Sequence, residues 1–110
     1  MMQMRVDRWD VRRDGPFTET ALLHKVRALG YDPVTRAYPA GAMISPHPDA
    51  RPRIQAVVSG LIKVTINGEA AILSAGDLVF VPADAAPRVE ILGPLGATCV
   101  ESVLAAEGDP

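Results

Sequence analysis

The stretch that decides the fold runs from Val57 to Pro82 and reads VVSGLIKVTINGEAAILSAGDLVFVP. Residues 61–66 alternate apolar and polar side chains, which is the period of a strand with one buried and one solvated face. The dipeptide Asn67-Gly68 follows, and it tolerates the positive φ angles of a two-residue hairpin turn. Residues 70–73 and 78–81 supply two further runs separated by a short turn. The stretch therefore predicts a three-stranded β-meander.

One substantial helix is expected before this stretch, over residues 18–29. Thr18 suits the N-cap position, where its side-chain oxygen can accept from a free backbone N–H. Gly30 suits the left-handed residue that ends a helix. Three apolar residues at helical spacing form a stripe that should pack onto the sheet: Leu22, Val26 and Leu29.

Short runs of strand character fill the rest of the chain, separated by turns rich in glycine and proline. Five more strands are expected, at residues 34–38, 42–45, 53–58, 88–92 and 97–104. The segment before the helix could add an edge strand, lie across a partner subunit or fray, and Trp9 in it is a candidate interface anchor. The fold class is all-β, mainly an antiparallel jelly-roll barrel with one N-terminal α-helix.

This order of elements resembles a small single-domain cupin. In that family a Gly-x₅-Pro-x-Gly-x-x-His motif follows the central hairpin, and Gly76 with Pro82 match its first two fixed positions. The resemblance covers roughly residues 39–101. It implies a single cupin domain over residues 18–104, preceded by an N-terminal arm at 1–17 and followed by a flexible tail at 105–110. Cupins host many unrelated activities, so the fold alone does not fix a function.

The resemblance also implies where a metal would be held, by a His-x-His pair, a following acid and a later histidine. His47 matches the first histidine, and Asp49 stands where the second would be. Arg53 falls at the acid position and Pro87 at the final histidine, so the metal-binding motifs are degenerate. The chain has only two histidines, and the other, His24, lies on the predicted helix. No cofactor is expected; the alternative is a divalent metal (Zn, Fe, Mn or Ni) held by His47 and Asp49.

Three functional hypotheses remain open. The favoured one is a metal-poor cupin that binds a small molecule, in one version anionic, through His47, Asp49 and Arg53, without catalysis. The second is a divalent-metal-dependent dioxygenase or isomerase with a reduced ligand set. The third is a metal-free isomerase or epimerase in which His47 is the acid/base and Asp49 fixes its tautomer. Arg53 could instead simply pair with Asp49 or Glu90.

Composition limits the remaining classes of function. The chain has 110 residues and a net charge of −2, with no basic stripe, so a nucleic-acid partner is not expected. No run approaches the roughly 20 apolar residues of a membrane span, and no signal peptide is expected. The single cysteine, Cys99, cannot form an internal disulfide, which favours the cytoplasm, and we expect it to be buried and inert. A homodimer is expected because association covers open sheet edges.

Overall fold

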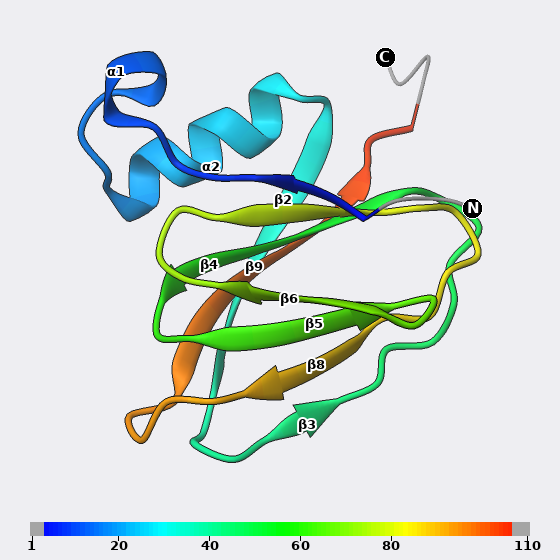
Figure 1. The fold of residues 1–110 in the computed structure, drawn as a ribbon. Helices are drawn as coiled ribbons and strands as arrows, with labels where there is room; N and C mark the ends of the chain where they lie inside the picture. The colour runs from blue at the N-terminus through cyan, green and yellow to red at the C-terminus, as the bar shows by residue number, and fades with distance from the viewer. Residues whose placement is uncertain (1–3, 107–110) are drawn as a thin grey trace.

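The computed structural model describes residues 4–106 and shows two antiparallel sheets facing each other, with the helices beside one of them (Figure 1). The first sheet has the strand order β1 (Arg5–Asp7), β7 (Leu78–Val81), β4 (Arg53–Ser59), β9 (Ala97–Leu104) and β2 (Tyr31–Tyr38). The second sheet has the order β3 (Met43–Ile44), β8 (Arg88–Ile91), β5 (Ile62–Ile66) and β6 (Glu69–Leu73). The predicted all-β jelly-roll barrel is therefore confirmed.

The hairpin predicted at Asn67-Gly68 joins β5 to β6. Asn67 has a φ of 51° and Gly68 a φ of 83°, as a two-residue hairpin with both central residues left-handed requires. The period-two pattern of β5 also holds, because Ile62, Val64 and Ile66 are buried between the sheets. These side chains form one core cluster with residues of the opposite sheet.

The predicted three-stranded meander is wrong at its third strand. In the structure β7 pairs with β1 and β4 in the first sheet, so residues 74–77 carry the chain from one sheet to the other. The physical reason is that β7 is apolar on both faces: Leu78 packs under the helix, and Val79 packs between the sheets. The Asp77 carboxylate stabilises this crossing by accepting from the Ser74 backbone N–H at 3.0 Å.

The predicted helix is confirmed as α2 (Glu19–Ala28), which covers the outer face of the first sheet. The Thr18 hydroxyl accepts from the Ala21 backbone N–H at 3.0 Å and caps its N-terminus. Leu22 and Val26 are fully buried against the sheet, whereas Leu29, expected in the same stripe, is 43% exposed. Leu29 is the C-cap residue, where the chain turns toward β2 and its side chain leaves the packed face.

The segment before α2 is folded onto the sheet, and Trp9 packs within this segment. Strand β1 extends the sheet at its edge, as one reading predicted, and it is followed by a helix that was not predicted, α1 (Val11–Asp14). One turn of helix is too short to show a hydrophobic period. Trp9 donates from Nε1 to the Gly15 carbonyl at 2.9 Å and packs edge-to-face on Phe17. It is therefore a packing residue of its own chain rather than a projecting anchor.

Strand β2 begins at Tyr31, three residues before the expected strand, and contains Pro33. Proline is tolerated there because β2 lies at the edge of the first sheet, where an absent N–H breaks no ladder.

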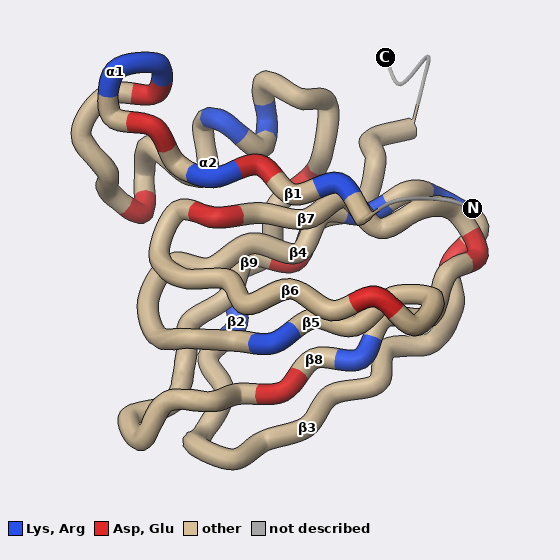
Figure 2. The backbone as a smooth tube through the Cα atoms, in the orientation of Figure 1, with Lys and Arg blue, Asp and Glu red and all other residues tan. Residues whose placement is uncertain are grey.

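Charged residues of both signs are interleaved along β1 and α1 (Figure 2), and Lys25 of α2 binds both Asp7 and Asp14. Of the expected tail, residues 107–110 lie outside the described residues. No helix between residues 4 and 106 is long and apolar enough to cross a membrane.

Candidate functional site

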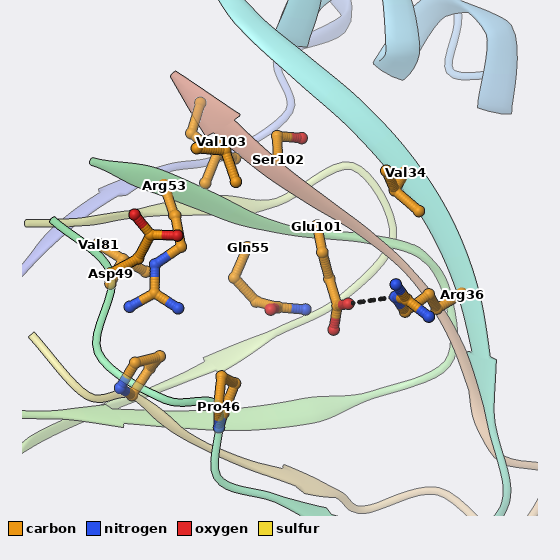
Figure 3. A pocket seen from close by; sticks show the side chains of 12 residues that line it. Val34, Arg36, Pro46, Asp49, Arg53, Gln55, Val81, Glu101, Ser102 and Val103 are labelled. Carbon is orange, nitrogen blue, oxygen red and sulfur yellow. Dashed lines mark ion pairs between the residues drawn. The ribbon is translucent and has the colours of Figure 1, made fainter. Parts of the chain in front are cut away.

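A cavity of about 270 Å³ opens at one end of the barrel, between the first sheet and the proline-rich loop before β4 (Figure 3). Its polar lining comes from β2, β4, β9 and the loop: Arg36, Asp49, Arg53, Gln55 and Glu101. Strand register explains why these residues meet. Arg53 and Gln55 are two positions apart on β4 and so share a face, and Glu101 of β9 is paired directly with Gln55.

Arg53 supplies a cation whose partners are backbone carbonyls. Its Nη2 donates to the Ala85 carbonyl at 2.7 Å, and its Nη1 donates to the His47 carbonyl at 3.3 Å. Its Nε is buried and has no hydrogen-bond partner. Among residues 4–106 neither Asp49 nor Glu90 forms an ion pair with it, so the expected pairing with one of these acids is absent there. The guanidinium therefore uses two of its five N–H donors and keeps its full charge at the cavity.

Gln55 adds a second donor without a partner. The residue is only 5% exposed, and its amide Nε2 makes no hydrogen bond of good geometry, although the side chain lies beside the weakly accepting Cys99 thiol. A buried polar group in this state costs about 1–3 kcal/mol relative to one that is satisfied. A third atom of this kind, Ser102 Oγ, is turned away from the centre of the cavity in Figure 3. Two residues that line the cavity, Arg53 and Gln55, therefore each carry a buried donor without a partner, at Nε and at Nε2.

Glu101 provides the acceptor of the cavity. Its Oε1 pairs with Arg36 Nε at 3.0 Å, and its Oε2 accepts from the Tyr38 hydroxyl. Burial, together with this hydrogen bond to Glu101, raises the pKa of Tyr38 well above its usual value, so the phenol stays protonated and donates. A carboxylate can accept about four hydrogen bonds. The two partners named here leave acceptor capacity on Glu101.

Asp49 lines the cavity, and His47 does not. The Asp49 carboxylate accepts from the Arg51 backbone N–H at 2.9 Å, and this bond is the main reason that its pKa is lowered. Asp49 is therefore an ionised carboxylate held by its own loop. The His47 side chain is exposed, and its contribution to the site is the carbonyl that Arg53 binds. Of the three predicted binding residues, the structure brings Asp49 and Arg53 together but not the imidazole of His47.

Three of the four positions that the cupin pattern assigns to a metal meet in this cavity, and His47 is the exception. Asp49, Arg53 and Pro87 all line it, which supports the register by which they were aligned. The side chains at these positions do not fit a divalent ion, because a permanent cation and a proline ring replace two ligands. Between residues 4 and 106, no three His, Cys, Asp or Glu side chains are grouped as a metal site requires.

Cys99 lies beneath the cavity and is buried, as expected. Its side chain packs between the sheets at 0% exposure. Burial raises the pKa of the Cys99 thiol to about 11, so the thiol stays protonated at neutral pH. A protonated, inaccessible thiol is not a nucleophile.

Sequence reasoning missed Gln55, Glu101 and Arg36. A signal for the first two was present, because each is a polar residue inside an otherwise apolar strand, in RIQAVV and TCVESVL. The signal can be interpreted only when two things are known: the face of the sheet to which each side chain points, and the strand that pairs with each residue. Arg36 gave no signal, since an arginine on an edge strand is usually solvated.

Comparison with known proteins agrees with the geometry. The model of the cupin domain family matches residues 34–101 of the chain. An RmlC-like cupin from Shewanella frigidimarina is 25% identical with a TM-score of 0.60, over 73% of this chain and 70% of that one. A DUF861 family protein from Thermotoga maritima is 12% identical with a TM-score of 0.58, over 92% of this chain and 99% of that one.

A longer protein also shares the fold. AerE from Microcystis aeruginosa is 17% identical with a TM-score of 0.64, and the match covers 69% of this chain but only 36% of AerE. No curated protein sequence matches the chain. The family model covers more than half of the 110 residues. The chain is therefore a small protein of the cupin domain family.

Proposed function

We propose that this protein binds a small organic anion in the cavity, with Arg53 as the group that holds the negative charge. The observation that carries the proposal is that Arg53 lines the cavity, while its Nε is buried and has no hydrogen-bond partner. Guanidinium remains protonated at any working pH, so the charge is permanent. The other cation of the lining, Arg36, is already paired with Glu101.

The energetics favour a bound anion over an empty site. An unsatisfied buried donor costs about 1–3 kcal/mol, and a charge-assisted hydrogen bond to an anion contributes about 1.5–3 kcal/mol. Gln55 Nε2 lies two positions along the same strand and adds a second donor that a ligand can satisfy. A volume of about 270 Å³ corresponds to roughly nine water molecules, which suits a ligand of about ten non-hydrogen atoms.

The two enzymatic hypotheses have less support. A metalloenzyme needs ligands where Arg53 and Pro87 stand. An acid/base pair of His47 and Asp49 needs the imidazole in the cavity, but the His47 side chain is exposed and Asp49 is engaged by Arg51. Binding without a metal is accordingly the function that we propose.

The test is a calorimetric titration of the purified protein with acetate, butanoate and inorganic phosphate. The wild-type protein should bind at least one of these anions, and Arg53→Gln should weaken that binding by roughly tenfold to a hundredfold, since it removes one charge-assisted hydrogen bond. Arg51→Gln is the matched control, because Arg51 lies two residues away but does not line the cavity. It should leave the affinity unchanged.

Two results would contradict the proposal. One is the absence of binding of all three anions at millimolar concentration. The other is equal affinity in Arg53→Gln and in the wild type. Because Arg53 also binds two carbonyls, circular dichroism and thermal unfolding must show that Arg53→Gln is folded. Arg53→Lys provides a second variant, which keeps the charge but lacks the Nε donor.

A further inference from the structure

Resting on the proposed function, we infer that the ligand is a hydroxy acid. Its carboxylate binds Arg53, and a hydroxyl on the same molecule lies between Gln55 Nε2 and Glu101. Figure 3 shows the Gln55 side chain between those of Arg53 and Glu101, with its amide nitrogen directed toward Glu101. The cavity thus presents a cation on one side and a donor facing an acceptor on the other.

The hydroxyl is inferred from the hydrogen-bond partners that Gln55 Nε2 and the Glu101 carboxylate lack. Gln55 Nε2 is a buried donor without an acceptor. Glu101 is an acceptor with capacity left after its bonds to Arg36 and Tyr38. A single group that satisfies both must accept one hydrogen bond and donate another. A hydroxyl does so through one oxygen, whereas an ammonium only donates and a methyl does neither.

The carboxylate follows from the state of Arg53. Two of its five N–H groups donate to carbonyls, so three N–H groups remain, and Nε has no partner at all. Asp49 and Glu101 also line the cavity, so a singly charged carboxylate is repelled less than a phosphate, which carries more negative charge at neutral pH. Inorganic phosphate is therefore expected to bind more weakly than butanoate in the titration above.

Strand register limits the length of the ligand. Gln55 and Glu101 are directly paired, and Arg53 is two residues along β4, so Arg53 and Glu101 occupy diagonal positions of the two strands. The Cα atoms of diagonal neighbours lie about 7–8 Å apart, so the two side chains can contact opposite ends of one small ligand. The 2-, 3- and 4-hydroxybutanoates are suitable probes, because they vary the number of carbons between the carboxylate and the hydroxyl.

The experiment compares the affinity of these hydroxybutanoates with that of butanoate and 4-aminobutanoate by calorimetry. At least one hydroxybutanoate should bind about tenfold or more tightly than butanoate, because without the hydroxyl both protein groups stay unpaired. 4-Aminobutanoate should gain no such advantage, since an ammonium cannot accept from Gln55. In Gln55→Leu and Gln55→Met the preference for the hydroxyl should vanish, so that a hydroxybutanoate and butanoate bind with nearly equal affinity.

Thr98→Val is the control variant, because it removes a hydroxyl from a residue of β9 that does not line the cavity. It should preserve the preference. The inference is overturned if hydroxybutanoates bind the wild type no more tightly than butanoate, or if the preference survives in both folded Gln55 variants. In either case butanoate binding that depends on Arg53 would leave the proposed function standing. If no anion binds at all, both fail together.

Discussion

Single buried polar residues determine what this barrel can hold. Arg53 could be singled out from the sequence because it stands in a recognisable motif at the position of an acidic ligand. Gln55 and Glu101 could not be assigned, because their roles depend on the pairing of β4 with β9. His47 was assigned by motif alone, and its side chain lies outside the cavity lining because proline-flanked loop residues have no periodicity that fixes their direction.

Asp77 is a second residue whose buried charge has a measurable effect. Its side chain is 9% exposed and pairs with Arg8 at 2.8 Å. Burial alone would raise the pKa of Asp77, but hydrogen bonds from the Ser74 backbone, Arg8 and the Trp9 backbone outweigh it, and the pKa is lowered. A lowered pKa stabilises the fold above the pKa of the unfolded chain, about 3.9, and that stability is lost as pH falls through the folded value.

We therefore predict that Asp77→Asn lowers the free energy of unfolding by about 1–3 kcal/mol at pH 7, since it weakens several hydrogen bonds to a carboxylate. The difference between variant and wild type should shrink as the pH falls below the pKa of the unfolded chain, about 3.9, toward the lower pKa of the folded carboxyl. Urea unfolding at pH 7 and at pH 3 measures both. Asp32→Asn, at an exposed position of β2, should change little. A deficit that is equal at the two pH values would count against this account.

At the scale of elements, local sequence patterns predicted turns and helix caps correctly. They failed for features that depend on contacts with distant parts of the chain. The Asn67-Gly68 hairpin and the cap of α2 depend on neighbouring residues and were correctly placed. The sheet to which β7 belongs depends on partners far along the chain, because a strand that is apolar on both faces fits either arrangement. The single turn of α1 gave no periodic signal.

The packing of α2 on the sheet leads to a prediction, and Leu29 of the same apolar stripe provides the control. Leu22→Asp or Val26→Asp should destabilise the domain by about 3 kcal/mol or more, because either places an unpaired charge at a fully buried position. Leu29→Asp should cost much less, since Leu29 is 43% exposed. Thermal unfolding followed by circular dichroism gives the comparison. Equal midpoints for Leu22→Asp and Leu29→Asp would mean that α2 is not docked as described.

At the scale of the whole molecule, the barrel leaves sheet edges and apolar side chains uncovered. Strand β2 is a long edge, and large apolar residues on several elements are exposed: Val34, Met43, Ile72 and Leu95. Association is a common way to cover such surfaces, and two-fold dimers are the commonest assemblies. Because Trp9 is engaged within its own chain, we expect a barrel face or an edge strand, rather than Trp9, to form the interface.

We predict a homodimer on this basis. Light scattering coupled to size exclusion should give twice the 11.7 kDa mass of the chain at tens of micromolar. Val34→Lys and Leu95→Lys, which place charges on exposed apolar positions at an edge strand and at a loop, test which surface is used. The substitution whose residue lies in the interface should shift the measured mass toward that of the monomer. A wild-type protein that elutes with the monomer mass at this concentration would contradict the prediction.

The measurement that tests the central claim most directly is the electron density of the cavity in a crystal grown with a hydroxybutanoate and with divalent metal present. We predict density for the acid, with its carboxylate within hydrogen-bond distance of Arg53 Nε and its hydroxyl between Gln55 and Glu101, and no metal peak among Asp49, Arg53 and Pro87. A metal ion coordinated by Asp49 and His47, or a ligand bound away from Arg53, would contradict it.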